Sequence, residues 1–153
     1  MSEVESRLSA AGVILPVPVA PVANYVPFVR SGSLVHISGQ VSLDASGGVK
    51  GVVGADVDLD AAQGAARLCG INLLAQMKAA CDGDLDRVVR VVKLGGFVQV
   101  GPDFIDIPKV VNGCSDLRVE VLGDAGRHAR SAVGVYRLPL GFAVEVDAVV
   151  EIA

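Results

Sequence analysis

The stretch Ala129–Ile152 reads ARSAVGVYRLPLGFAVEVDAVVEI, and its alternation of apolar with small or polar residues predicts β-structure. Two strands are expected, over Ala129–Tyr136 and Phe142–Ile152. The turn between them is expected at Leu138-Pro139-Leu140-Gly141, because proline and glycine favour turn conformations. The segment therefore predicts a β-hairpin that closes the chain.

Arg130 is the residue of this segment that most needs an explanation, because a guanidinium in an Ala-Arg-Ser-Ala-Val strand must find a partner or a ligand. In an unbulged hairpin around Pro139 and Leu140, Arg130 lies diagonal to Asp147, and Glu145 is one step farther on the same face. Two interpretations stay open. Arg130 forms a salt bridge within the hairpin, or it binds an anionic ligand.

Hydrophobic periodicity upstream predicts helices and further strands. Helices are expected over Ser2–Ala11, Leu59–Ala80 and from Pro108 to Gly123. Strands are expected over Tyr25–Val29, Leu34–Ser38 and Val49–Val53, and over Val88–Val92 with Phe97–Val100 as one strand kinked or bulged at Gly95-Gly96. Strands and helices that follow one another in this order predict an α+β fold.

The length of 153 residues predicts a single domain over 1–153, in which residues 1–24 form an N-terminal helix and a Pro-rich arm. A hydrophobic fraction of 52% against 20% charged residues is the reverse of the composition of disordered chains. Two helices can cover only one face of the sheet, yet Val89 and Val91 oppose Val88 and Val92 on the two faces of one strand. An exposed apolar face of this kind predicts a homo-oligomer.

Several classes of protein are excluded by composition and motif content. A net charge of −4 offers no basic surface for nucleic acid. Residues 8–29 carry no charge, but four prolines interrupt them, so neither a membrane span nor a secretory signal is expected. Three cysteines without a CxxC pair indicate a reducing, cytoplasmic compartment, and no motif for a nucleotide, a metal or a cofactor is present.

Other candidate residues have both a structural and a functional interpretation. Gly39 either allows the backbone conformation at the end of a strand or lets a ligand approach the main chain. Asn112 is interpreted as a helix amide, and Tyr25 as a half-buried strand aromatic. Ser115 has no recognisable base in the sequence and is interpreted as a structural helix residue. Arg118, Arg127 and His128 either enlarge an anion site or lie on the surface.

Together these positions resemble the RidA/YjgF family of reactive-intermediate deaminases, also annotated endoribonuclease L-PSP. The strongest match is the closing segment, which looks like the family's ARS/A, LP and V/IEIEA motifs. Asn24-Tyr25-Val26, Ser38-Gly39-Gln40 and Asn112 match its tyrosine, SGQ and helix asparagine positions, so the likeness covers roughly Val22 to the end. One departure is Ala132, where many members carry a cysteine.

The resemblance implies a chorismate-mutase-like α+β fold, with a mixed sheet and two helices packed on one face, assembled as a homotrimer with clefts between subunits. It also implies a metal-free imine deaminase without a cofactor, in which Arg130 holds the substrate carboxylate and Glu145 acts on the attacking water. Tyr25, Gly39, Asn112 and Ala132 would shape the substrate pocket. The loss of the thiol at Ala132 argues against a covalent route more than against deamination.

Three functions follow from this interpretation. The first is hydrolysis of small 2-imino acids to 2-oxo acids and ammonia. The second is a non-catalytic trimer that binds a small carboxylate and has a regulatory role in metabolism. The third, endoribonuclease activity, is disfavoured by the acidic charge balance and by the lack of a histidine pair for general acid and base.

Overall fold

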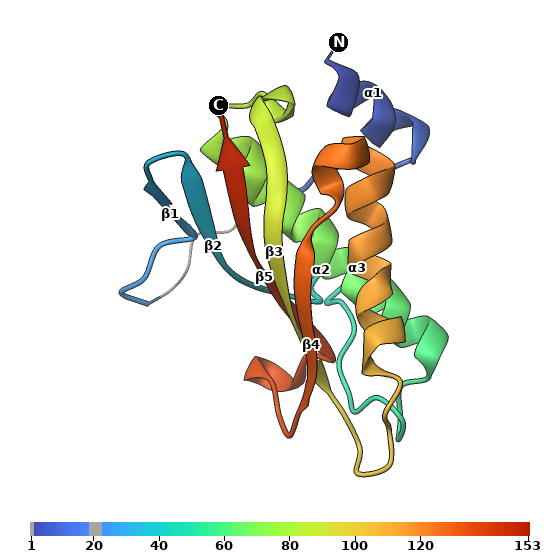
Figure 1. Ribbon diagram of the computed structural model, residues 1–153. Coiled ribbons are helices and arrows are strands. Elements are labelled where there is room, and N and C mark those ends of the chain that lie inside the picture. The colour runs from blue at the N-terminus through green and yellow to red at the C-terminus, as the bar shows by residue number, and fades with distance from the viewer. Residues whose placement is uncertain (1, 19–22) are drawn as a thin grey trace.

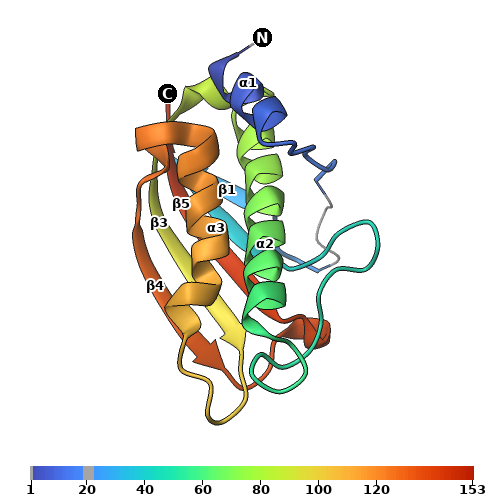
Figure 2. The ribbon, with the colours of Figure 1, turned by 90° about the vertical axis from the view of Figure 1, so that its right-hand side faces the viewer.

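Two long helices lie side by side across one face of a five-stranded sheet (Figures 1 and 2). The structure is a computed structural model that describes residues 2–18 and 23–153. Its helices are α1 (Glu3–Ala10), α2 (Leu59–Ala80) and α3 (Ile107–Leu122), with 3-10 turns η1 (Leu85–Arg87), η2 (Gly123–Gly126) and η3 (Pro139–Gly141). Its strands are β1 (Phe28–Ser31), β2 (Leu34–Val41), β3 (Val88–Gln99), β4 (Ala129–Val135) and β5 (Val144–Ile152).

The strand order is β1-β2-β5-β3-β4, which makes the sheet mixed. β3 and β4 run parallel, and the other neighbouring pairs are antiparallel. The parallel pair is connected through α3, because parallel neighbours need a crossover rather than a tight turn. The predicted mixed α+β sheet with two helices on one face is therefore confirmed.

Helix α2 forms where the sequence predicts it. The side chain of Asp58 caps its first turn by accepting a 2.8 Å hydrogen bond from the backbone N–H of Ala61. One face of the helix is buried against the sheet and α3. Its side chains on that face include Ala62, Ala66, Cys69, Leu73, Leu74 and Met77. This stripe at intervals of three and four residues is the pattern that predicts the helix from sequence.

Helix α3 begins with Pro108 in its first turn and ends at Gly123, whose φ of 61° lies in the left-handed region that glycine adopts without strain. It packs closely on α2. A Cβ atom on Gly113 would collide with the backbone carbonyl of Gln63, and one on Gly70 would lie 2.8 Å from the guanidinium of Arg118. These two glycines therefore set the close approach of the helices.

Strand β5 lies in the middle of the sheet and alternates between core and open face along its whole length. Buried residues alternate with half-buried ones along the strand. The buried ones lie on the face that the helices cover, and they are Val144, Val146, Ala148, Val150 and Ile152. Glu145, Asp147, Val149 and Glu151 lie on the face that no helix covers. This alternation is the half-buried pattern expected of a strand with one face in the core.

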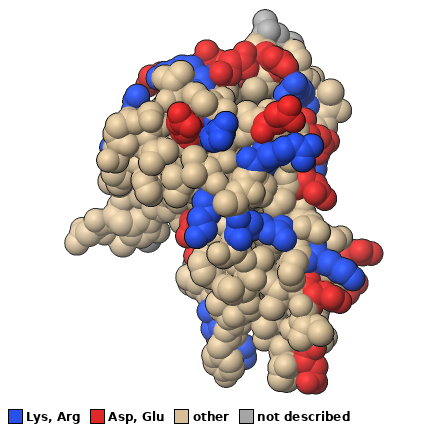
Figure 3. Space-filling model, viewed as in Figure 1, with Lys and Arg blue, Asp and Glu red and all other residues tan. Residues whose placement is uncertain are grey.

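The open face carries several exposed apolar side chains, among them Val29, Val89, Val92 and Val133. In the view of Figure 3, basic side chains lie beside acidic ones, and neither sign of charge dominates this side of the molecule. An uncovered apolar sheet face is typical of a surface that another protein covers.

The predicted closing hairpin is wrong. β4 and β5 do not pair, because β3 lies between them, parallel to β4 and antiparallel to β5. The 3-10 turn η3 joins the two strands across the intervening strand instead of folding them onto each other. An alternating pattern shows which faces a strand has, but the partner of a strand depends on contacts that are distant in sequence.

Three smaller expectations also differ from the structure. The first strand covers Phe28–Ser31 rather than Tyr25–Val29, so Tyr25 precedes the strand and is exposed instead of half-buried. Val49–Val53 forms isolated bridges, including Lys50 with Phe142, rather than a strand. The irregularities of β3 lie near its start, between Val88 and Lys93, whereas Gly95 and Gly96 pair in regular register with β5. These two glycines are needed for space: a Cβ on Gly96 would lie 2.8 Å from the methyl groups of Val111.

The predicted N-terminal helix is confirmed as α1. Its first backbone N–H groups, those of Glu3 and Val4, donate to the carboxylate of Asp86 over 3.1 and 3.0 Å. Val4 and Leu8 are buried against the core, so α1 packs over the ends of the larger helices (Figure 2). Part of the expected Pro-rich arm, including Pro21, lies outside the described residues.

Burial predicts how two chemically identical substitutions differ. Ile37 of β2 is 3% exposed in the core, whereas Ile14 is 90% exposed. Ile37→Ala is expected to lower the free energy of unfolding by about 2–5 kcal/mol, because it removes buried methyl groups and leaves a cavity. Ile14→Ala, the matched control, is expected to change it by less than about 0.5 kcal/mol. Urea denaturation at one protein concentration measures both, and equal effects would contradict the assignment of the core.

Candidate functional site

Arg130 lies on the helix side of β4 and is held by side chains of α3. Its Nη1 donates to Oδ1 of Asn112 over 2.8 Å and to Oγ of Ser115 over 3.1 Å. Its Nη2 makes only a long 3.5 Å contact with the carbonyl oxygen of Pro108. The acceptors are neutral, so they orient the guanidinium without neutralising its charge.

No ion pair within residues 2–18 and 23–153 includes Arg130, Glu145 or Asp147. The salt bridge considered for Arg130 is therefore wrong, because β3 separates β4 from the acidic residues of β5. Arg130 is half-buried, and no carboxylate of the described residues forms an ion pair with it. A guanidinium in this state can bind a carboxylate with two parallel hydrogen bonds.

Ala132 lies two residues along β4 on the same side as Arg130. It pairs with Gly96 of β3 and packs, partly buried, against the hydrophobic core. The structure thus brings Arg130, Asn112 and Ala132 together, as the resemblance implies. We call this group, with Ser115, the Arg130 half-site.

Glu145 lies on the opposite, open face of the sheet and reaches over Gly39 of β2. A Cβ atom on Gly39 would lie 2.6 Å from Oε2 of Glu145, so only glycine leaves room for the carboxylate there. Tyr25 is exposed and close along the chain to Val26, whose carbonyl accepts from Oγ of Ser38 over 2.7 Å. We call Glu145 with Gly39 the Glu145 half-site.

Burial raises the pKa of the Glu145 carboxyl above its usual value, and the neighbouring Asp147 carboxylate raises it further. The pKa of Asp147 is raised by burial too, although a hydrogen bond from the backbone of Gly95 and the charge of Lys93 oppose the shift. A carboxylate that holds a proton more tightly is a better base when it is ionised. Glu145 is therefore suited to take a proton from water.

The two half-sites cannot meet in one chain. The expectation that Arg130 and Glu145 share a face is wrong, because Arg130 lies beside Leu94 in the core-side row and Glu145 beside Phe97 in the open-face row. β3 also lies between their strands.

The Arg130 half-site also contains a serine and a histidine that sequence reasoning did not connect. Oγ of Ser115 lies 2.9 Å from Nε2 of His128, and Nδ1 of His128 lies 2.6 Å from the carbonyl oxygen of Gly126. Ser115, for which the sequence showed no recognisable base, therefore has an imidazole within hydrogen-bond distance. Thirteen residues and the η2 turn separate the two side chains, so no local motif predicts their contact.

Arg118 and Arg127 lie in different surroundings. Arg127 is exposed and pairs with Asp124 at 3.3 Å, as expected of a surface residue. Arg118 is fully buried between α2 and α3, where its guanidinium donates to the carbonyl of Gly70 and contacts Sδ of Met77 at 3.8 Å. Neither the surface nor the anion-site interpretation holds for Arg118.

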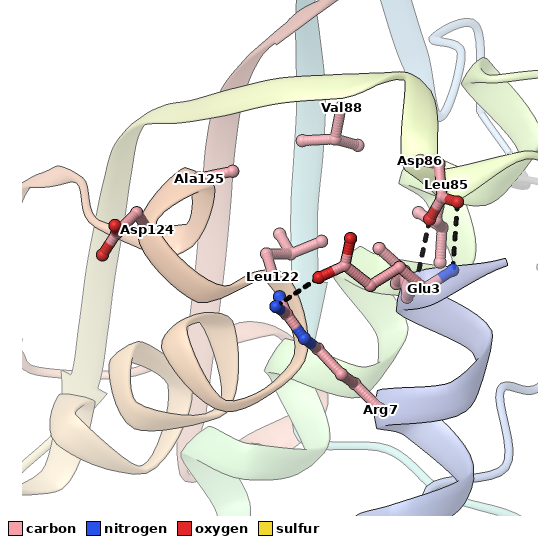
Figure 4. A pocket seen from close by; sticks show the side chains of 9 residues that line it. Glu3, Arg7, Leu85, Asp86, Val88, Leu122, Asp124 and Ala125 are labelled. Atoms are coloured by element: carbon pink, nitrogen blue, oxygen red, sulfur yellow. Dashed lines mark hydrogen bonds and ion pairs between the residues drawn. The ribbon is translucent and has the colours of Figure 1, made fainter.

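Two hollows lie away from both half-sites. The larger, of about 350 Å³, lies between α1, η1 and the end of α3, where Arg7 extends toward Glu3 and Asp86 binds the start of α1 (Figure 4). The other, of about 200 Å³, is lined by residues near Phe104. Neither of these two hollows is lined by Arg130 or Glu145.

The described residues contain no cluster of three or more histidine, cysteine, aspartate or glutamate side chains that could hold a metal ion. Cys69, Cys81 and Cys114 are buried, unpaired thiols, as expected of core cysteines. Over the same part of the chain, no helix combines the length and the apolar character that crossing a membrane requires.

Comparison with known proteins identifies one family. Its sequence model, described as "YjgF/chorismate mutase-like, putative endoribonuclease", matches residues 5–151. Protein TCP17 of Trypanosoma cruzi is 49% identical over 151 residues, which cover 97% of this chain and 94% of that protein.

Solved structures agree with this match. Atu1372 of Agrobacterium tumefaciens, a protein of unknown function, superposes with a TM-score of 0.93 at 50% identity, over 98% of this chain and 92% of that one. RidA from the Antarctic bacterium Psychrobacter sp. PAMC 21119 superposes with a TM-score of 0.63 at 27% identity, over 89% of this chain and 94% of that one. The expected chorismate-mutase-like fold is confirmed.

The contact between Gly39 and Glu145 predicts a coupled effect on stability. Gly39→Ala is expected to lower the free energy of unfolding by about 1 kcal/mol, because the added methyl group displaces the Glu145 carboxylate. In the Glu145→Ala background the same change is expected to cost almost nothing, since the obstructing atoms are absent. A double-mutant cycle measured by urea denaturation tests this, and additive effects would show that the two residues do not touch.

Proposed function

Because the chain belongs to the YjgF/chorismate mutase-like family, we propose that it is a hydrolytic deaminase of small 2-imino acids. The reaction releases ammonia and leaves a 2-oxo acid. The observation that carries the proposal is Arg130, a half-buried guanidinium that neutral acceptors orient and that no described carboxylate neutralises. Similarity to a RidA protein supports the same function.

Arg130 is suited to hold the carboxylate of the substrate. Nη1 is engaged by Asn112 and Ser115, whereas Nη2 has only the 3.5 Å contact with Pro108. Donors on the remaining edge of the guanidinium can form two parallel hydrogen bonds with a carboxylate. Such a pair fixes the orientation of the substrate as well as its position, which places the adjacent imine carbon.

Glu145 is suited to activate the water. It accepts a proton as the water oxygen bonds to C2 of the imine, and the C=N electron pair moves to nitrogen. That proton passes from Glu145 to nitrogen, which gives a carbinolamine. The hydroxyl proton of the carbinolamine then moves to nitrogen through Glu145, the C–N bond breaks, and ammonia leaves as the C=O bond forms. The products are the 2-oxo acid and ammonia, and Glu145 returns to its ionised form. Burial raises the pKa of Glu145, which favours the first transfer, from water to the carboxylate.

The reaction requires a cleft between two protomers. Arg130 and Glu145 lie on opposite faces of the sheet, and β3 separates their strands. In a closed ring of three chains, the Arg130 half-site of one protomer meets the Glu145 half-site of the next, because head-to-tail contacts join two different surfaces. The exposed valines of the open face are the apolar surface that such an assembly would bury.

Loss of the guanidinium is expected to abolish turnover. With 2-iminopropionate generated by an amino acid oxidase, Arg130→Ala is expected to lower kcat/KM by about 100-fold or more, because the carboxylate loses its orienting partner. Arg127→Ala, an exposed arginine three residues upstream, is the matched control and is expected to keep full activity. Ammonia release measures both. Undiminished activity in Arg130→Ala would overturn the mechanism, and ligand binding without turnover in the unaltered protein would leave a carboxylate-binding protein.

Mixing two inactive variants tests whether the cleft is shared. Arg130→Ala supplies intact Glu145, and Glu145→Gln supplies intact Arg130. We expect each cleft to take Arg130 from one protomer and Glu145 from its neighbour. When the two variants are unfolded together and refolded in equal amounts, about a quarter of the clefts should then contain both intact residues. Each variant refolded alone is the control and is expected to stay inactive. No recovery in mixed assemblies of confirmed composition would show that both residues act from one chain.

A further inference from the structure

Ser115 has the surroundings of an activated nucleophile. It lies on α3, and its Oγ is 2.9 Å from Nε2 of His128. The other ring nitrogen of His128, Nδ1, is held at 2.6 Å by the carbonyl oxygen of Gly126. A hydroxyl, a base within hydrogen-bond reach and a third group that orients the base are the parts that nucleophilic catalysis by serine needs.

The hydrogen bonds fix the direction of every proton in this group. A carbonyl oxygen only accepts, so Nδ1 of His128 carries the proton that it donates to Gly126. In the neutral ring, Nε2 is then an acceptor, and the hydroxyl of Ser115 donates to it. Burial lowers the pKa of His128, the hydrogen bond with Gly126 opposes this shift, and the charges of Arg118 and Arg130 lower the pKa further, which favours the neutral ring.

Arg130 supplies a positive charge beside the Ser115 hydroxyl. Its Nη1 donates to Oγ of Ser115 over 3.1 Å, which places a positive charge beside the oxygen that would become an alkoxide. An adjacent cation stabilises that charge and strengthens the nucleophile. The same guanidinium retains donors for an anionic substrate, because only Nη1 is engaged by Asn112 and Ser115.

We propose that Ser115, with His128 as its general base, is a nucleophile that accepts the acyl group of small carboxylate-bearing esters or thioesters bound at Arg130. Oγ bonds to the acyl carbon as its proton moves to Nε2 of His128, and the tetrahedral oxyanion collapses as the alcohol or thiol leaves with that proton. Water then attacks the Ser115 ester with His128 again as base, which releases the acid and restores the hydroxyl.

This activity does not rest on the proposed deamination, although both reactions use Arg130. Glu145 and the neighbouring protomer have no part in it, because Ser115, His128 and Arg130 all belong to one half-site. The two proposals can therefore fail independently. Loss of imine turnover leaves serine modification untouched, and an unreactive Ser115 leaves deamination untouched.

Covalent modification tests the nucleophile directly. The full chain is treated with a fluorophosphonate at pH 7.5, and the modified residue is located by peptide mass spectrometry. One phosphonyl group on Ser115 is expected. Modification is expected to be absent in Ser115→Ala and about 100-fold slower in His128→Gln, because the general base is lost. Ser131→Ala, a serine on the exposed side of β4, is the matched control and should be modified at Ser115 at the original rate.

Esters of defined charge test the substrate class. Mono-4-nitrophenyl fumarate, whose trans carboxylate cannot attack its own ester, is expected to react at least about 10-fold faster than its neutral methyl ester, and Arg130→Ala should remove that preference. No modification of Ser115, modification at an equal rate in His128→Gln, or equal rates with the two esters would each overturn the proposal.

A thiol at the same position tests access to the site. The native cysteines Cys69, Cys81 and Cys114 are buried. Ser115→Cys is therefore expected to react with one equivalent of iodoacetamide, at a rate that falls about 10-fold when His128→Gln is added. A protected thiol in the folded Ser115→Cys variant would show that reagents do not reach the Ser115 position, and the nucleophile would be ruled out.

Discussion

The pleat of β5 is the constraint on which the rest of the structure depends. This strand is hydrogen-bonded on both sides, to β2 and to β3, so its orientation sets that of the whole sheet. Its even-numbered residues from Val144 to Ile152 fill the core beneath the helices, and burying this row of aliphatic side chains is the main gain from folding this strand. The odd-numbered acids, Glu145 and Asp147, are thereby forced onto the open face.

The position of β3 between β5 and β4 then separates the strands that carry Glu145 and Arg130. It places β4 at the edge of the sheet, with Arg130 turned toward α3, and keeps Glu145 on the other face. Each chain consequently carries Arg130 and Glu145 on different faces of the sheet. The deamination that we propose would join residues of two chains, whereas Ser115 and His128 are in contact within one chain.

Much of the fold can be predicted from local sequence, and the failures share one cause. The helix over Leu59–Ala80 follows from apolar spacing and an aspartate cap, and its bounds are those predicted. The closing hairpin is wrong because alternation in Ala129–Val135 and in Val144–Ile152 fits any neighbour strand equally well. Arg118 was expected on the surface because a charged side chain is rarely buried without a carboxylate partner. It is buried all the same, and a backbone carbonyl accepts its hydrogen bond.

The sequence by itself determined the α+β class, the helices, the alternating faces of the closing strands and the family resemblance, because these depend on residues close together along the chain. The resemblance also singled out Arg130 and Asn112, whose side chains are in contact. Only the tertiary structure decided that Arg130 and Glu145 lie on opposite faces, and that Ser115 contacts His128. Strand order and the packing of α3 on β4 arise from contacts between distant segments, and no local pattern encodes which of these contacts is most stable.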